Sequence, residues 1–318
     1  MTTLPQASRA VLPALDADLE QAVRYARAEK ASATRRAYHS DFTLFESWCA
    51  EKGVTALPAE PETVAAFLAF EANRGIRPST ITRRAASIRY AHKLRGHEPP
   101  TNSEAVRATL RGIRRSTGTA KVRKAPILAE TARAMAQAAP DGLKGLRDQA
   151  LLLLGFAGAF RRSELVALDV TDLEETDEGM RVAIRRSKTD QEGKGEIIAI
   201  VRGSVNCPVK AVKNWLQATS ITEGPLFRSV TKGGSVGNSR LTDKSVAGII
   251  KSYARRLGPN EADFSGHSLR SGFLTSAARR GASVFKMRDV SRHKSMDVLQ
   301  RYIRDAELFR DHAGAGLL

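Results

Sequence analysis

A polar, basic stretch without apolar periodicity, Ser116 to Pro126, separates two parts of the chain that both carry helical patterns. A segment of this kind has no apolar face to bury, so it is typical of a linker between domains. The chain has 318 residues, which is enough for two domains of about 150 residues each. We therefore predict two domains, residues 1–116 and 127–318, joined by a basic linker over residues 117–126.

The first part shows the spacing of amphipathic helices. Between Thr34 and Lys52 the aromatic residues recur every three or four positions, which predicts one apolar helix face. Pro61 stands where it can open a second helix. Ser79 and either Asn102 or Ser103 are candidate N-caps for a third and a fourth helix. We predict a small domain of four helices.

The second part combines helices with a few strands. The apolar segment Leu143–Phe156 predicts a buried helix, and alternating residues over Met180–Arg186 and Glu196–Val201 predict two strands joined by a polar loop. Further helices are predicted over Pro208–Thr219, Thr242–Leu257, Ser268–Arg280, Val284–Val290 and Ser295–Arg304. The predicted fold is therefore mainly α, with a four-helix N-terminal domain and a mixed α+β C-terminal domain that holds a small antiparallel sheet.

The charge of the chain favours a polyanionic partner. Lys and Arg number 51 against 34 Asp and Glu, so the net charge is +17, and neutralising phosphates would release counterions. Between Arg77 and Lys124 stand 13 basic residues and two acidic ones, a local excess of 13 − 2 = 11. A long solvated helix face could carry the same charges. We predict that this region binds DNA through Arg77, Arg83, Arg84, Arg89, Lys93, Arg111, Arg114, Arg115, Lys121, Arg123 and Lys124.

Other classes of protein fit the sequence poorly. The longest apolar run, Ala150–Phe160, has 11 residues, whereas a membrane helix needs about 20. The two cysteines, Cys49 and Cys207, stand far apart, which suits a reducing interior, so we expect a cytoplasmic protein without a membrane partner. Walker A, H-E-x-x-H and clustered-carboxylate patterns are absent from the sequence, so we predict neither a metal nor a cofactor.

Metal-free chemistry on a phosphodiester needs a side-chain nucleophile, fixed cations for the nonbridging oxygens and an acid for the leaving oxygen. The second part of the chain carries residues of all three kinds. Each of them is common on its own, and their order along the chain is the more specific signal. They are Arg161 and Glu164 in GAFRRSELVAL, Lys188 in RRSKTDQEGKG, His267 and Arg270 in GHSLRSG, and His293 and Tyr302 in RHKSMDVLQRYI.

This order resembles the tyrosine recombinases, or phage-type integrases. Their pattern is G-x-R-x-S-E-L, a lysine in a β-turn, H-x-L-R, and a G-H box followed nine residues later by the nucleophilic tyrosine. The resemblance implies that Tyr302 is the nucleophile, that Glu164 has a supporting role, and that Arg161, Lys188, His267, Arg270 and His293 are catalytic. Lys194 lies in the same loop as Lys188 and remains an alternative to it.

Two positions depart from the family pattern. Ala159 stands where the first motif usually has glycine, and Arg292 stands where glycine usually precedes the histidine of the last motif. Neither change removes a catalytic group. Both raise a question about the local backbone shape.

The resemblance implies a site-specific recombinase that cuts and rejoins DNA through a 3′-phosphotyrosyl intermediate and a Holliday junction. It also implies a core-binding N-terminal domain and a homotetramer on a double-stranded recombination site, formed from monomers in solution. Phage integration, mobile-element movement and the resolution of plasmids or chromosomes all remain open as its task, as does whether the tail after Tyr302 packs on its own domain or on a neighbour. The alternatives are a type IB-like topoisomerase, a catalytically inactive DNA-binding protein of the same fold, and a basic scaffold or RNA-binding protein.

Overall fold

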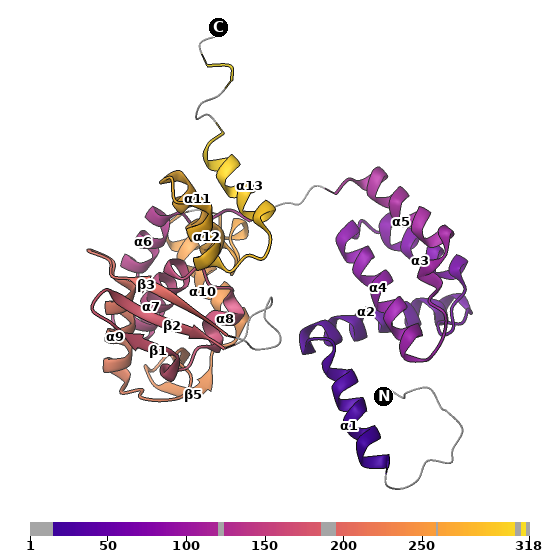
Figure 1. Ribbon diagram of the computed structural model, residues 1–318, viewed down its shortest axis with the longest axis horizontal. Helices are drawn as coiled ribbons and strands as arrows, with labels where there is room; N and C mark the ends of the chain where they lie inside the picture. The colour runs from indigo at the N-terminus through magenta and orange to yellow at the C-terminus, as the bar shows by residue number, and fades with distance from the viewer. Residues whose placement is uncertain (1–14, 120–123, 186–194, 259, 309–312, 316–318) are drawn as a thin grey trace. The chain divides into compact units, whose positions relative to one another are not determined.

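The computed structural model describes residues 15–119, 124–185, 195–258, 260–308 and 313–315 (Figure 1). Contacts divide the chain into two compact units, with the division between Val122 and Arg123. This division falls inside the segment that was predicted to be a linker. Each unit has its own hydrophobic core.

The first unit is helical and contains one helix more than predicted. Its described part holds five α-helices and a short 3-10 helix, because the residues from Asp16 onward form a helix of their own. Ser103 is the N-cap of the last one, and its hydroxyl accepts a hydrogen bond from the backbone of Val106. Ser79 is not an N-cap, because it lies inside the helix that it was predicted to cap, which begins at Pro78 with Arg77 as its N-cap. The elements are α1 (Asp16–Ala28), α2 (Ser32–Lys52), α3 (Pro61–Asn73), α4 (Pro78–Leu94), η2 (Pro100–Asn102) and α5 (Glu104–Thr117).

The aromatic stripe of α2 forms the core of the first unit. Phe45 and Trp48 are buried, and Phe45 contacts Phe67 of α3 edge to face, with ring centroids 5.1 Å apart. Ile81 and Ile88 of α4 are fully buried in the same cluster. The spacing of three or four residues therefore identified the face of α2 that packs inward.

Buried charges also join the helices of the first unit. Asp41 of α2 and Glu71 of α3 are both 2% exposed, and Arg84 of α4 forms ion pairs with both. Arg83 donates from Nε to Asp41 at 2.6 Å. Buried carboxylates need such partners, because an unpaired charge is strongly unfavourable in the interior. This network therefore ties α2, α3 and α4 together.

The second unit contains two small antiparallel sheets. The predicted strands correspond to β2 and β3, which pair with Val182 opposite Ile198. The remaining three strands were not predicted, because segments of three to five residues are too short to show alternation. One sheet has the order β1 (Leu173–Glu175), β2 (Gly179–Ile184), β3 (Glu196–Val201), and the other pairs β4 (Arg228–Val230) with β5 (Val236–Arg240).

The apolar run of the sequence forms the central helix of the second unit. Leu151, Leu152 and Leu154 of α7 are fully buried, and α7 contacts α6, α9, α11 and β3 (Figure 1). In the described residues, every helix is too short or too polar to cross a lipid bilayer. The helices are α6 (Ala129–Gln137), α7 (Leu143–Ala157), α8 (Arg162–Ala167), α9 (Pro208–Thr219), α10 (Asp243–Arg256), α11 (Ser268–Arg279), α12 (Val284–Ser291) and α13 (Met296–Ala306), with 3-10 turns η3 (Val170–Asp172) and η4 (Glu261–Asp263).

The chain that enters the second unit lies directly against α11. Ile127 donates its backbone N–H to Ser268 O at 2.9 Å, and Ala129 donates to the hydroxyl of Ser276 at 3.0 Å. A Cβ on Gly272 would overlap the carbonyl oxygen of Ile127, so glycine permits this close approach. Helix α11 is therefore held between α7 and the incoming segment, and this fixes the position of its first turn.

Candidate active site

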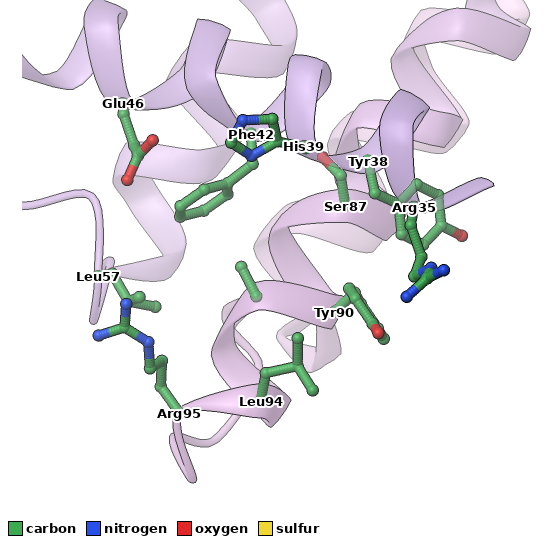
Figure 2. A pocket seen from close by; sticks show the side chains of 11 residues that line it. Arg35, Tyr38, His39, Phe42, Glu46, Leu57, Ser87, Tyr90, Leu94 and Arg95 are labelled. Atoms are coloured by element: carbon green, nitrogen blue, oxygen red, sulfur yellow. The ribbon is translucent and has the colours of Figure 1, made fainter. Parts of the chain in front are cut away.

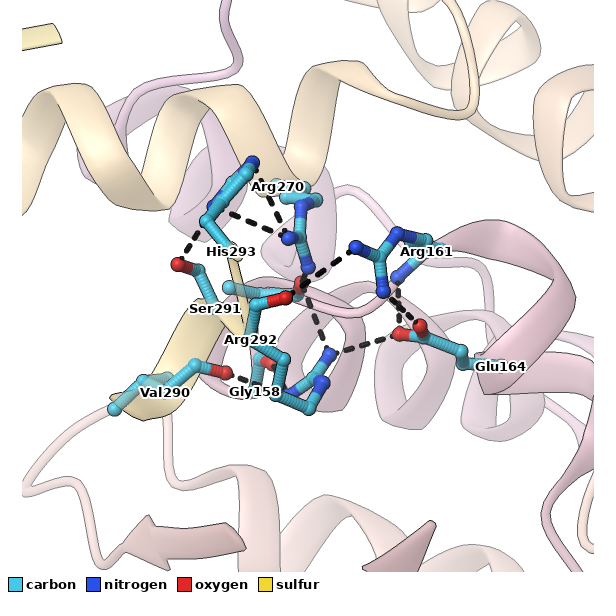
Figure 3. A network of polar contacts seen from close by, with 9 residues as sticks. Gly158, Arg161, Glu164, Arg270, Val290, Ser291, Arg292 and His293 are labelled. Carbon is cyan, nitrogen blue, oxygen red and sulfur yellow. Dashed lines mark hydrogen bonds and ion pairs between the residues drawn. The ribbon is translucent and has the colours of Figure 1, made fainter. Parts of the chain in front are cut away.

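Three segments far apart in the sequence meet at one place in the second unit (Figure 3). The first is the turn after α7, where Arg161 is the N-cap of α8. The second is the beginning of α11, with His267 at the N-cap and Arg270 in the first turn. The third connects α12 to α13 and carries His293. The structure thus brings together four residues that the sequence singled out, Arg161, Glu164, Arg270 and His293.

Glu164 holds Arg161 in place. The backbone N–H of Arg161 donates to Oε2 of Glu164 at 2.9 Å, and Nη1 of Arg161 donates to Oε1 at 2.5 Å. Glu164 is buried, and burial acts to raise the pKa of its carboxyl group. The charge of Arg292 and the hydrogen bonds from Arg161 outweigh burial, so the pKa lies below its ordinary value. Glu164 is therefore a carboxylate at neutral pH.

Arg270 is fully buried, and both of its terminal nitrogens have partners inside the protein. Its Nη1 donates to the carbonyl oxygen of Ala159 at 2.7 Å, and its Nη2 lies 3.2 Å from Nδ1 of His293. Its Nε has no hydrogen-bond partner among the described residues. Burial and the charges of Arg161 and Arg292 lower the pKa of Arg270 to about 9. An anion at this place would relieve the repulsion and accept the unused hydrogen bond.

His293 lies within the same cluster as a neutral imidazole. Burial and the charges of Arg270 and Arg161 lower its pKa to about 3. Its Nδ1 is 2.8 Å from the hydroxyl of Ser291. His267 is exposed and lies close enough to contribute to the lowered pKa of His293. Two imidazoles therefore lie beside the guanidinium groups of this site.

Tyr302 lies on α13 and is half-buried against Leu274, Ala278 and Leu299. Its phenol acts to raise the pKa of Arg270, so the two side chains lie within electrostatic range of each other. Lys188 and the alternative Lys194 both lie outside the described residues.

The two departures from the family pattern share one backbone conformation. Ala159 has φ +45° and Arg292 has φ +57°, so both lie in the left-handed region that favours glycine. Arg292 is buried and forms an ion pair with Glu164 at 2.8 Å. Arg292 was not predicted to belong to this site. The signal that could have found it was a long charged side chain at a position where the family pattern has glycine.

The predicted DNA-binding residues fall into groups with different surroundings. Arg84 is 12% exposed and Arg83 is half exposed, and both form the ion pairs with buried carboxylates described above. The Nζ of Lys124 donates to the carbonyl oxygen of Ala262 at 2.5 Å. Lys121 and Arg123 lie outside the described residues. The exposed residues on or beside α4 and α5 are Arg77, Arg89, Lys93, Arg111, Arg114 and Arg115.

A groove of about 680 Å³ runs between α2 and α4 (Figure 2). Tyr38 and Tyr90 line it with ring centroids 5.5 Å apart, and Phe42 lies further along α2. Arg35 and Arg95 also line the groove, although neither was among the predicted DNA-binding residues. No group of three or more His, Cys, Asp or Glu side chains in the described ranges could hold a metal ion.

Comparisons with known proteins point to one family. Residues 127–308 match the model of the phage integrase family. The chain is 42% identical over 299 residues to the integrase/recombinase XerD homolog of Selenomonas ruminantium, which covers 92% of this chain and 87% of that protein. It is 26% identical over 281 residues to the Cre recombinase of Escherichia phage P1, which covers 82% of this chain and 80% of that protein.

Two solved structures have the same fold. One is the XerH recombinase in a post-cleavage complex with its difH substrate, with TM-score 0.58 and 17% identity, covering 78% of this chain and 70% of that one. The other is a lambda integrase dimer bound to a core site, with TM-score 0.59 and 16% identity, covering 91% of this chain and 94% of that one. The chain therefore belongs to the phage integrase family of tyrosine recombinases.

Proposed function

We propose that this protein is a site-specific recombinase that cuts and rejoins double-stranded DNA. The observation that carries the proposal is a buried cluster of guanidinium groups in which Nε of Arg270 lacks a hydrogen-bond partner in the described part of the chain. A phosphodiester supplies the negative charge that this cluster lacks. Tyr302 lies within electrostatic range of the same cluster.

The proposed reaction begins with attack of the Tyr302 hydroxyl oxygen on the scissile phosphorus. The new O–P bond gives a 3′-phosphotyrosyl link, and the bond from phosphorus to the 5′ oxygen breaks. A phenol is a weak nucleophile while it keeps its proton, so the proton must leave as the oxygen attacks. The phenolic proton passes to the imidazole of His267, because the lowered pKa of His293 makes that ring a poor base. His293 can instead donate a hydrogen bond to the phosphate. The departing 5′ oxygen takes a proton from a general acid, for which Lys188 is the candidate and Lys194 the alternative.

Arg161 and Arg270 stabilise the charge that develops on the nonbridging oxygens, since a guanidinium can donate two parallel hydrogen bonds to a phosphate. Glu164 is a positioning residue, because it binds Arg161 by both backbone and side chain. The phosphotyrosyl link retains the energy of the phosphodiester bond. The 5′-hydroxyl of a second strand can therefore reverse the step without a cofactor, and two such exchanges pass through a Holliday junction.

The two units have different proposed roles. Residues 1–116 form the core-binding domain, residues 117–126 the linker, and residues 127–318 the catalytic domain. The exposed basic residues on α4 and α5, together with Arg35 and Arg95 at the groove, contact DNA phosphates. We further propose that the protein acts in the cytoplasm as a tetramer on paired sites and is a monomer in solution. Movement of a mobile element is one task that suits such an activity.

The test is covalent trapping on a library of nicked duplexes. Cleavage beside a nick releases a short strand, so the reverse reaction is prevented and the adduct accumulates. Sequencing the trapped DNA identifies the target site. The variant Tyr302→Phe is expected to bind the recovered duplex and to form no adduct. A protease-sensitive adduct formed by that variant would contradict the assignment of the nucleophile. Two-site recombination, measured beside supercoil relaxation, separates a recombinase from a topoisomerase.

A further inference from the structure

We propose that Arg292 is a positioning residue of this active site. Its buried side chain joins the loop that carries His293 to the turn that carries Arg161 and Glu164, and so sets the shape of the phosphate pocket. This inference rests on the proposed function and names a residue that the family pattern does not assign.

The backbone at Arg292 is in a conformation that a long side chain disfavours. Its φ of +57° ends helix α12 in the left-handed region, where glycine is the ordinary residue. The side chain is nevertheless turned inward, and the residue is only 5% exposed. Its Nε is buried without a hydrogen-bond partner among the described residues. Both features are unfavourable for folding, so the position requires a compensating role.

The guanidinium of Arg292 binds two segments at once (Figure 3). Nη2 donates to Oε2 of Glu164 at 2.8 Å, and Nη1 donates to the carbonyl oxygen of Gly158 at 3.1 Å. Nη1 also donates to the carbonyl oxygen of Val290 at 2.5 Å in the last turn of α12. The guanidinium carbon lies 5.3 Å from the centre of the Phe160 ring. Arg292 therefore fastens the end of α12 to the turn between α7 and α8.

The connection also reaches both of the proposed phosphate-binding arginines. Nη2 of Arg161 donates to the backbone oxygen of Arg292 at 3.4 Å. The carbonyl oxygen of Ala159 accepts from Nη1 of Arg270 at 2.7 Å and from Nη2 of Arg292 at 3.4 Å. The next residue in the chain is His293, which lies 3.2 Å from Nη2 of Arg270. A shift of Arg292 would therefore change the positions of Arg161, Arg270 and His293.

Arg292 also determines how the charge of Glu164 is shared. Oε1 of Glu164 accepts from the side chain of Arg161, whereas Oε2 accepts from Arg292 and from the backbone of Arg161. Without Arg292, the buried carboxylate would have only Arg161 as a cationic partner among these contacts. Arg161 would then be drawn toward Glu164 and away from a phosphate. The loss of Arg292 should therefore weaken catalysis more than it weakens DNA binding.

The experiment compares Arg292→Gln, Arg292→Lys and Arg292→Gly with the wild type on a nicked duplex recovered from the trapping library. Thermal unfolding, affinity for the intact duplex and the single-turnover cleavage rate are measured for each. Glycine removes the backbone strain, and lysine keeps the charge. The matched control is Arg147→Gln, because Arg147 also forms a buried ion pair in this unit, at 2.6 Å from Asp148, outside the pocket.

We expect Arg292→Gln and Arg292→Gly to bind DNA within about threefold of the wild type and to cleave about 10- to 100-fold more slowly, since small misplacements of reacting groups have effects of this size. Arg292→Lys should recover part of the rate. Arg147→Gln should unfold at a lower temperature and cleave at the wild-type rate when assayed in its folded range. If Arg292→Gln does not fold, the cleavage rates of Arg292→Gly and Arg292→Lys test the inference instead.

The inference would be overturned if the folded Arg292→Gly and Arg292→Gln proteins cleaved at the wild-type rate. If Arg292→Gln is unfolded, wild-type rates in Arg292→Gly and Arg292→Lys would overturn it. So would a rate that falls only in proportion to DNA affinity. Failure of the wild type itself to form an adduct would instead contradict the proposed function, so the two failures can be told apart.

Discussion

The fully buried guanidinium of Arg270 donates to the carbonyl oxygen of Ala159, 2.7 Å away, and Ala159 itself has φ +45°. The unusual backbone of Ala159 thus presents its carbonyl oxygen to the side chain that we propose binds phosphate. A residue at this position affects the site through its backbone and only indirectly through its side chain. The first prediction tests this relationship.

Ala159→Gly should change the free energy of unfolding by no more than about 1 kcal/mol, since relief of the left-handed strain offsets the loss of a buried methyl group. Ala159→Val should destabilise by roughly 2–3 kcal/mol, because a β-branched residue disfavours this conformation and adds volume. Urea unfolding measures both. The control for volume alone is Ala150→Val in helix α7, where Ala150 is equally buried. Equal losses at the two positions would mean that backbone strain is unimportant.

Replacement of either proposed phosphate-binding arginine should reduce cleavage far more than folding. Arg161→Gln and Arg270→Gln are each expected to slow single-turnover cleavage by about 100-fold or more, which corresponds to roughly 3 kcal/mol. The control is Arg162→Gln, because the adjacent Arg162 is exposed and pairs with Asp243 at 3.0 Å. A rate near that of the wild type in either variant would count against the proposal that Arg161 and Arg270 both bind the scissile phosphate.

Some basic residues of α4 should contribute to DNA binding and others to the stability of the first unit. Arg89→Gln and Lys93→Gln should each make the slope of log K against log salt shallower by about 0.9, as expected for one lost phosphate contact. Arg84→Gln should instead destabilise the first unit by roughly 3 kcal/mol, because it leaves Glu71 and Asp41 buried with fewer partners. Fluorescence anisotropy over a range of salt concentrations gives the slopes. Unchanged slopes for both Arg89→Gln and Lys93→Gln would remove this face from the DNA interface.

The first unit should lose stability in acid through His92. This residue is fully buried; Ala59 N–H donates to its Nε2 at 2.9 Å, and its Nδ1 lies 2.8 Å from the carbonyl oxygen of Ile88. Burial lowers the pKa of His92 below its ordinary value. The unfolded chain therefore binds a proton near pH 6.5, at a pH where folded His92 stays neutral. The contribution of His92 is fully present above about pH 6.5 and is lost as the pH falls toward the pKa of the folded state.

Urea unfolding of the full chain at about pH 5 and about pH 8 measures this effect. His92→Gln should reduce the difference between the two conditions, whereas His39→Gln, at an exposed position on α2, should leave it unchanged. An acid loss that is equally large in His92→Gln and the wild type would assign the effect to other groups.

Elements with a long, regular pattern could be predicted from the sequence. The helix predicted over Pro208–Thr219 is α9 with the same bounds, and the strand predicted over Glu196–Val201 is β3. Helix α8 was not predicted, because its six residues are too few to show a helical period. The additional helix α1 has little apolar pattern beyond exposed side chains such as Leu19 and Tyr25.

The residues of the proposed site were identified from their order along the chain. The interactions among them could not be predicted from the sequence. Arg84 forms ion pairs with Glu71 and Asp41. These pairs depend on how three helices pack, so the sequence around Arg84 could not predict them. The same is true of Arg292, whose partner Glu164 lies 128 positions earlier. A basic residue in the sequence is equally compatible with a phosphate and with a buried carboxylate. Only the packed structure separates the two uses.

The contact between Gly272 and Ile127 has a mechanical consequence. The chain leaving the linker is hydrogen-bonded along α11, the helix whose first turn carries Arg270. A displacement of residues 125–129 would therefore shift α11 as a whole, because the hydrogen bonds join the two along the helix. The guanidinium of Arg270, which we propose binds phosphate, would move with its first turn.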